Sequence, residues 1–419
     1  SIPAHLMRVA GGVPAAVVHL AHASKEGLIK EDSQFETTSD GSRLRPVYEA
    51  WLDAVPKNVR ASLGVTAALG DLVDPDVLEK VAQAIVPTPA LTNELVHRGM
   101  LVRDPASSRV RFSSKLEAEV AYARLSRGHR STVHRQAALV LAQKGTDPDI
   151  VAKHFEDAGD KSEALEKYRE ATVVYAERKD RPRLIACYRK ACELATDVPG
   201  EDNRFIEDAL ALIPMLLEAG KVGDVEVLIL NAEKAAQAVG DPRFAVQVTA
   251  QRIQMMISQN LFQEAGPILN DALAKARELR DGTLLSDLLA QAAEVAERDG
   301  RVDAAIKYLS TALELAGRVD NQRSRNQAVG HLGSLGRILF RASQFEKAQA
   351  TFRQQQDAAR KIKNRMEEGR ALVNEAAVLQ SREQYDSALE RLRIGLDVSR
   401  SVGDLLTVSK AQHNTAHIY

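Results

Sequence analysis

The chain has 419 residues, which is room for two or three domains, and its formal net charge is -1. This balance gives no bulk electrostatic reason to expect binding to nucleic acid or to an anionic membrane. No apolar run reaches the roughly 18 residues that a membrane-spanning helix needs, and no signal peptide is visible. The chain starts at Ser1 and stops at Tyr419 within a helical pattern, so we expect a segment of a longer cytoplasmic protein.

Residues 1–27 predict a helix that begins near Pro14, because proline suits the first helical turn. The step Gly11-Gly12-Val13-Pro14 resembles the Gly-x-Pro element in the lid of signal-transduction ATPases, the STAND class of the AAA+ superfamily. This resemblance implies that residues 1–27 are a remnant of an ATPase lid, in which Pro14 lies against a bound adenine. Residues 28–44 are polar and predict a linker.

Residues 45–125 predict a winged-helix-like domain. Two apolar-periodic segments, broken at Val55-Pro56, are followed by helices at 77–85 and 90–98 and by two short strands within 100–112. A helix that reads DNA should carry several Arg, Lys, Asn or Gln residues. The candidate helix at 90–98 carries few of them, so we do not expect DNA binding, although a winged-helix transcription regulator stays an alternative.

The segment after the predicted wing contains His134, then Asp147-Pro-Asp-Ile-Val-Ala-Lys-His-Phe155 and Ala158-Gly159-Asp160. This order is similar to the stretch that joins the winged helix to the repeats in bacterial STAND regulators, which carry kinase, cyclase or LuxR-type outputs. The family usually has Phe-x-His where this chain has Phe112-Ser113-Ser114. Ser114 cannot supply an imidazole to a nucleotide phosphate, so that contact is lost here or is made differently.

Six short stretches, each a turn followed by a helix start, recur through the rest of the chain. From the second stretch on, their last residues are 40, 40, 43 and 40 positions apart, and the first step of 61 leaves room for an extra helix around 184–194. The stretches are residues 159–164, 220–225, 260–265, 300–305, 343–348 and 383–388.

Each stretch ends on a small or β-branched anchor residue that is followed four positions later by a large apolar residue. Seven positions after the anchor the residue is usually small, with Gln355 as the exception. These spacings place the residues on one helix face. Upstream lies another amphipathic helix, in which Leu335-Gly336 or Ala376 allows a close approach. The large residues are Tyr168, Ile229, Leu269, Leu309, Phe352 and Leu392.

The pattern resembles the tetratricopeptide repeat (TPR), in the longer variety found in bacterial regulators and kinesin light chains. The predicted class is therefore all-α with a small β-hairpin wing: a right-handed α-α superhelical TPR-like solenoid over residues 126–419, truncated at its C-terminal end and preceded by the winged helix. A non-repeating helical bundle is the alternative. Pro214 lies inside a predicted helix and should kink it.

Stacked hairpins curve so that their first helices line a concave face, which could bind a peptide through charge-assisted hydrogen bonds. The alternative is that Glu294 and Arg337 only pair with each other across adjacent repeats. Basic residues between 360 and 370 form either a solvated loop or a contact for an acidic partner. The groove candidates, counted back from the anchors, are Gln254, Glu294, Arg337, Phe340, Arg341, Arg370 and Gln380, with Gln247, Asp287 and Glu297 beside them.

The sequence has no Gly-x-x-x-x-Gly-Lys-Ser/Thr loop, so this segment cannot cradle a triphosphate alone, and it has neither Gly-x-Ser-x-Gly nor His-Glu-x-x-His. We expect no catalytic residue, metal or cofactor in it, and ATP or ADP only in the parent protein. His413 and His417 are four residues apart on a predicted helix but lack an acidic or thiol partner. We interpret them, like His19 and His22, as helix-surface or interface histidines.

The order of these segments predicts the regulatory sensor of a STAND-type signalling protein. Its repeats would bind a protein, a peptide or a small inducer and couple that binding to an ATPase or output domain outside this chain. A TPR adaptor without nucleotide chemistry is the alternative, motivated by Ser114. We expect no membrane partner, and the oligomeric state stays open.

Overall fold

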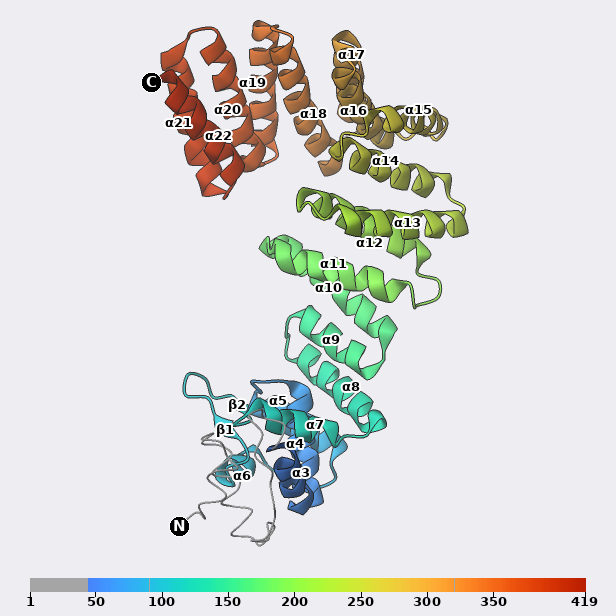
Figure 1. Cartoon of the computed structure of the whole chain (residues 1–419), viewed down its shortest axis with the longest axis vertical. Helices are drawn as coiled ribbons and strands as arrows, with labels where there is room; N and C mark the ends of the chain where they lie inside the picture. Colours follow the sequence, from blue (N-terminus) through green and yellow to red (C-terminus); the bar gives the residue numbers. More distant parts are fainter. Residues whose placement is uncertain (1–43, 90, 320) are drawn as a thin grey trace. The chain divides into compact units, whose positions relative to one another are not determined.

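The structure, a computed structural model, describes residues 44–89, 91–319 and 321–419. The predicted lid-type helix with Pro14 and the predicted linker up to residue 43 lie outside the described residues. The chain divides into two compact units, Ser1–Pro199 and Gly200–Tyr419 (Figure 1). The predicted fold class is confirmed, because the described residues form helices throughout apart from one two-stranded sheet.

The first described elements of unit 1 have the winged-helix order. The chain breaks between its first two helices at Val55-Pro56, as predicted, and Val73 forms an isolated bridge to Val110 beside the antiparallel hairpin. The helix predicted at 90–98 is shorter than expected at both ends. The elements are α3 (Leu44–Ala54), α4 (Lys57–Leu69), α5 (Pro75–Ile85), α6 (Thr92–His97), β1 (Val102–Arg103) and β2 (Val110–Arg111).

The core of this domain continues into the next two helices, α7 (Lys115–Ala123) and α8 (Arg127–Gln143). Leu63, Leu78 and Leu95 are fully buried in one cluster with Val133 and Ala137 of α8. Burying each leucine contributes roughly 1.5–3 kcal/mol. Helix α8 is therefore held by the same core as the winged helix.

The remainder of unit 1 is a helical hairpin followed by one more helix. Helices α9 (Pro148–Ala158) and α10 (Lys161–Arg178) are joined at Gly159, whose φ of 86° places it in the left-handed region. Helix α11 (Arg181–Ala195) is the extra helix that the step of 61 residues predicted, and it packs against α10.

Unit 2 is a succession of antiparallel helical hairpins followed by a last helix, coloured green to red in Figure 1. Consecutive helices pack against each other, and each first helix also packs against the first helix of the next hairpin. The helices are α12 (Asp202–Glu218), α13 (Val222–Val239), α14 (Pro242–Ser258), α15 (Phe262–Glu278), α16 (Gly282–Arg298), α17 (Val302–Arg318), α18 (Gln322–Arg341), α19 (Phe345–Lys361), α20 (Arg365–Ser381), α21 (Tyr385–Ser401) and α22 (Leu405–Ile418).

The six repeated stretches form the turns inside the hairpins. The first residue of each has a positive φ, and the next residue donates a hydrogen bond back to the carbonyl five positions earlier, as Gln344 does to Leu339 at 2.9 Å. This is the Schellman ending of a helix, which glycine favours. The positive-φ residues are Gly159, Gly220, Asn260, Gly300, Ser343 and Glu383.

The residues after each turn form the contact between the two helices. The anchors, such as Ala305 and Ala348, are 0% exposed, and the large apolar residue four positions later is buried in every repeat. The exception, Gln355, is buried as well: its Nε2 donates to Glu367 at 2.9 Å, and Gly333 leaves room for it. These features establish TPR-type hairpin packing.

Most first helices of unit 2 begin at an Asp or Asn side chain. Asp281, for example, accepts hydrogen bonds from the backbone N–H groups of Thr283 and Leu284 at 3.1 and 3.0 Å. Such N-caps fix the residue at which each helix starts, so equivalent positions of successive first helices face the same side. The capping residues are Asp241, Asp281, Asn321, Asn364 and Asp404.

Candidate functional site

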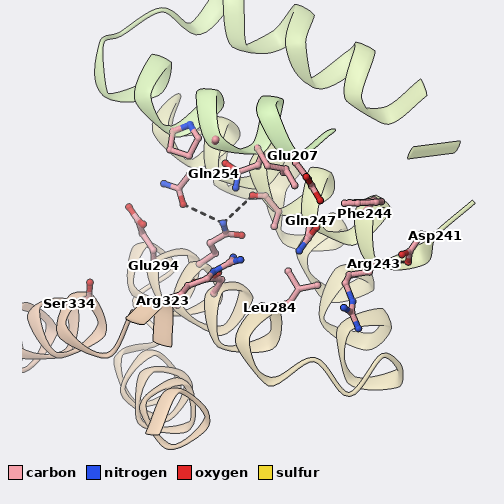
Figure 2. Close-up of a pocket in the computed structure, with 18 residues that line it drawn as sticks. Glu207, Asp241, Arg243, Phe244, Gln247, Gln254, Leu284, Glu294, Arg323 and Ser334 are labelled. Carbon is pink, nitrogen blue, oxygen red and sulfur yellow. Dashed lines mark hydrogen bonds and ion pairs between the residues drawn. The ribbon is translucent and has the colours of Figure 1, made fainter. Parts of the chain in front are cut away.

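A polar cavity of about 910 Å³ opens along the first helices of successive hairpins in unit 2. Figure 2 shows its lining from α12, α14, α16 and α18, and we call it the groove. Its apolar lining residues are Leu210, Ala211, Pro214, Phe244, Ala250, Leu284 and Ala290. Its polar lining residues are Glu207, Asp241, Arg243, Gln247, Gln251, Gln254, Asp287, Gln291, Glu294, Arg323 and Ser334.

Two glutamine side chains link neighbouring helices across the groove. The Nε2 of Gln291 on α16 donates to the backbone carbonyl of Ala250 at 3.0 Å and to Oε1 of Gln254 at 3.4 Å, both on α14 (Figure 2). Oε1 of Gln291 is buried and has no hydrogen-bond partner in the described part of the chain. Buried acceptors of this kind are rarely left unpaired in proteins, so this oxygen is a candidate contact for a ligand.

The acidic side chains of the groove differ in how they are compensated. Asp287 accepts a hydrogen bond from Gln327 and lies 3.4 Å from Arg323, yet burial still raises the pKa of its carboxyl. Burial also raises the pKa of Glu294, against the attraction of Arg337. Among the described residues, neither Glu207 nor Glu294 has a cation within 4 Å.

A smaller cavity of about 100 Å³ adjoins Glu294 between α16, α17 and α18. The sequence suggests an ion pair between Glu294 and Arg337 across adjacent repeats, but these two residues form no direct ion pair. The pair between the two repeats is instead Arg341 with Glu297, at 2.5 Å. Arg337 donates to Oγ of Ser334 at 3.0 Å, and burial, followed by the neighbouring Arg341, lowers its pKa. The smaller cavity therefore holds a cation that no carboxylate neutralises directly.

The structure separates the predicted groove residues into two sets. Gln254 and Glu294 line the groove with Gln247 and Asp287, and Arg337 and Arg341 line the smaller cavity with Glu297.

The other predicted residues line neither cavity. The ring of Phe340 packs against Phe345, with centroids 5.8 Å apart. Arg370 binds Glu367 at 2.7 Å and Asp404 at 3.1 Å. Gln380 is half-buried near the end of α20.

The arginines among the basic residues between 360 and 370 bind carboxylates of the chain itself. Arg360 and Arg365 each lie 2.7 Å from the buried carboxylate of Glu368. Breaking a buried ion pair costs several kcal/mol because it leaves one charge uncompensated. These arginines hold the turn between two hairpins and are neither a purely solvated loop nor free for an acidic partner.

The predicted reader helix of the winged-helix domain has its polar side chains bound within the domain. Oδ1 of Asn93 accepts from Arg103 of β1 at 2.6 Å, and Arg98 pairs with Glu94 at 2.8 Å. Ser114 caps α7 by accepting from the backbone N–H of Glu117 at 3.2 Å. Serine at this position thus has a structural role in the chain.

Two buried histidines join α8 to α9. Their Nδ1 atoms lie 3.0 Å apart, and the hydroxyl of Tyr122 lies 3.0 Å from Nε2 of His134. Burial lowers the pKa of His134, and burial together with His134 lowers that of His154 to about 4. A hydrogen bond between the two Nδ1 atoms requires one ring to donate its N–H and the other to accept. One of the two histidines is therefore unprotonated at Nδ1.

The remaining histidine pair lies near the end of the chain, where the rings of His413 and His417 are 4.5 Å apart. Over the residues whose structure is described, no group of three or more His, Cys, Asp or Glu side chains is placed to hold a metal ion. In the same portion of the chain, no helix combines the length and apolar character needed to cross a membrane.

Several residues of the groove do not stand out in the sequence as ligand positions, namely Glu207, Leu210, Pro214, Gln291 and Arg323. A signal for some of them exists. Gln251 and Gln291 are 40 residues apart, as are Gln254 and Glu294, so the repeat places each pair at equivalent positions. Gln291 follows its cap Asp281 by ten positions, as Gln251 follows Asp241.

No family model matches the sequence, and no curated protein matches it. Solved structures do. A signal transduction ATPase with numerous domains and a tetratricopeptide repeat sensor, from Pyrococcus horikoshii, is 13% identical over 99% of this chain, with a TM-score of 0.46. This chain spans 65% of that protein's length.

Two further solved structures show a similar level of likeness. A Rap protein complexed with competence and sporulation factor is 13% identical, over 73% of this chain and 87% of its own, with a TM-score of 0.47. Aspartyl phosphate phosphatase F from Bacillus subtilis is 12% identical, over 87% and 95%, with a TM-score of 0.43. With identities of 12–13% and TM-scores below 0.5, these similarities do not identify a ligand or a partner of this chain.

Proposed function

We propose that this chain is a regulatory sensor scaffold that binds a protein or peptide segment in the groove of unit 2. The observation that carries the proposal is the open polar cavity of about 910 Å³ along four successive first helices. Solenoid repeats present extended concave surfaces of this kind to their ligands. The repeat determines where each first helix begins, and this in turn determines which side chains line the binding surface.

The chemistry of the groove favours a segment of extended backbone. Gln247 and Gln251 each offer an amide donor pair and a carbonyl acceptor, Gln254 offers its Nε2 donors, and Gln291 offers its Oε1 acceptor. A peptide unit also offers one donor and one acceptor, so a row of amides can match it along its length. The described lining is mainly polar, which favours a peptide over an apolar small molecule.

The proposed coupling to an ATPase or output domain rests on unit 1. Helix α8 contributes Val133 and Ala137 to the core of the winged helix, and it contacts α9 through His134 and His154. The first hairpin and the winged helix are therefore one packed body. A ligand acts through such a body only by its different affinity for two states of the whole protein.

Peptide selection tests the binding part of the proposal. The whole chain, immobilised, is used to select from a random linear peptide library, and the dissociation constants of enriched peptides are measured by fluorescence polarisation. Removing two hydrogen-bonding amides at about 0.5–1.5 kcal/mol each predicts a loss of about tenfold in Gln254→Ala/Gln291→Ala. The matched control is Gln237→Ala, on the exposed face of α13. Failure to enrich any peptide would refute the binding scaffold.

Coupling is tested in the natural full-length protein. We expect a selected peptide to change the rate of ATP hydrolysis, and the Gln254→Ala/Gln291→Ala variant to lose that response. A full-length protein that binds the peptide but neither binds nor hydrolyses ATP would instead be an adaptor, and the coupling half of the proposal would be wrong.

A further inference from the structure

The described walls of the groove carry four carboxylates, from Asp and Glu, and two cations, both from Arg. Glu207 on α12 and Glu294 on α16 have no cation within 4 Å in the described structure, and Oε1 of Gln291 is buried without a partner. Pro214 has no N–H to donate to the carbonyl of Leu210 one turn earlier, and both residues line the groove. These acceptors come from side chains and backbone alike.

The cations of the groove are already engaged with other carboxylates. Arg323 lies 3.4 Å from Asp287, and Arg243 lies 3.7 Å from Asp281 at the start of α16. The Arg337 of the adjoining cavity attracts Glu294, but the pKa of Glu294 is still raised by burial. The described groove thus contains two carboxylates, Glu207 and Glu294, that no arginine or lysine of the chain pairs with directly.

Helix α14 packs against both α12 and α16, so Glu207 and Glu294 stand on the helices at either side of it. Gln254 on α14, labelled in Figure 2, accepts a hydrogen bond from Gln291 on α16. A peptide whose backbone binds the amides of Gln254 and Gln291 would therefore have Glu207 on one side and Glu294 on the other. Charge-assisted hydrogen bonds from arginine or lysine are the strong contacts that such carboxylates accept.

Building on the proposed function, we propose that the groove selects an extended peptide segment with basic side chains. Its backbone binds the amides of Gln254 and Gln291, and its arginine or lysine side chains bind Glu207 and Glu294. A segment rich in Asp or Glu is rejected, because its carboxylates would be repelled by Glu207 and Glu294.

The peptide selection described above tests this inference by composition. We expect the enriched peptides to contain more Arg and Lys than the starting library and fewer Asp and Glu. Replacing the basic residues of an enriched peptide by Gln should weaken its binding at least tenfold, and 0.5 M NaCl should weaken the parent peptide. Enriched peptides that are neutral or acidic would overturn the inference while leaving the binding scaffold in place, and no enrichment would overturn both.

Substitutions in the chain test whether Glu207 and Glu294 are the residues that select basic peptides. Glu207→Gln and Glu294→Gln should each weaken the basic peptide at least threefold, and together at least tenfold, without weakening its Gln-substituted analogue. The control Glu278→Gln removes an exposed carboxylate of α15 outside the groove and should leave binding unchanged. Unchanged binding in the double variant would overturn the inference.

Thermal unfolding separates binding from folding. Because burial raises the pKa of Glu294, its carboxylate opposes folding at neutral pH, and Glu294→Gln should leave Tm unchanged or raise it. A lower Tm accompanied by loss of binding to every peptide would show that Glu294 supports the fold, which contradicts its assignment as a ligand contact.

Discussion

Gly336 lies where α18 packs tightly against α19. A Cβ at this position would stand 2.5 Å from Cε1 of Phe352, a residue that is itself buried on α19. Gly330, on the same helix, is exposed, and a Cβ added there would have nothing within 4 Å. One glycine is thus required by packing, whereas the other is only tolerated by the helix.

Gly336→Ala should therefore destabilise unit 2 by about 1–3 kcal/mol, because the added methyl overpacks the contact with Phe352. Gly330→Ala is the matched control and should stabilise the helix by up to about 1 kcal/mol, since alanine is the better helix former. Urea unfolding followed by circular dichroism measures both. Equal effects of the two substitutions would contradict the close approach.

The buried histidine pair predicts how the stability of unit 1 depends on pH. The pKa of His154 is about 4 in the folded chain against an ordinary value of 6.5. A histidine with a lowered folded pKa contributes full stability above pH 6.5 and loses it as the pH falls toward 4. The shift corresponds to a loss of about 3 kcal/mol. We expect this loss in urea unfolding of the wild type and a much flatter profile in His154→Gln, and parallel profiles would contradict the pairing.

At this scale the sequence identifies residue types but not their contacts. The burial of the anchors and of Phe352 follows from helical spacing alone, because the same face recurs in each repeat. Which of two nearby charges pairs is decided by side-chain geometry: Glu297 binds Arg341, although Glu294 and Arg337 are as well placed in the sequence. Side-chain geometry also decides that Oε1 of Gln291 has no hydrogen-bond partner among the described residues, so the sequence does not predict it.

The turns inside the hairpins are the elements on which the repeat depends. Three of the six have glycine at the position of positive φ, and the others have Asn260, Ser343 and Glu383. For a residue with a Cβ this conformation costs roughly 1–2 kcal/mol. The helix ends there because the Schellman hydrogen bonds and the hairpin contacts outweigh that cost.

Glu383→Gly should accordingly stabilise the chain by about 0.5–1 kcal/mol, since glycine adopts the left-handed conformation without strain. Glu390→Gly, at an exposed position inside α21, should destabilise it by a similar amount, because glycine in a helix interior loses more backbone entropy. Thermal unfolding of both variants checks the opposite signs. A destabilised Glu383→Gly would contradict the turn geometry.

The order and type of the elements are largely predictable from the sequence, because turn residues, caps and apolar spacing agree. Helix α18 shows where the agreement ends. Its cap, Asn321, lies 40 residues after Asp281, but the next anchor comes 43 residues after the last, so three residues lengthen the helix at its far end. Counting back from the anchor therefore indicates Arg337, whereas the groove is lined at Ser334.

At the scale of the whole molecule, the chain combines a winged helix packed with a first hairpin and a second body of hairpins that carries the groove. The predicted domain boundaries at 27, 44 and 125 stay predictions. The ligand cannot be predicted from the sequence because the side chains that define it come from helices α12, α14 and α16, each separated from the next along the chain by a second helix. Only the repeat period connects them.

Hydrogen–deuterium exchange of the whole chain, with and without a selected basic peptide, shows whether the groove of unit 2 binds that peptide. We predict slower exchange in the first helices α12, α14 and α16, which line the groove, and unchanged exchange in the second helices α13 and α15 behind them. Glu207→Gln/Glu294→Gln should abolish the protection. Protection confined to the second helices, or to the winged helix, would contradict the account of a groove that binds basic peptides.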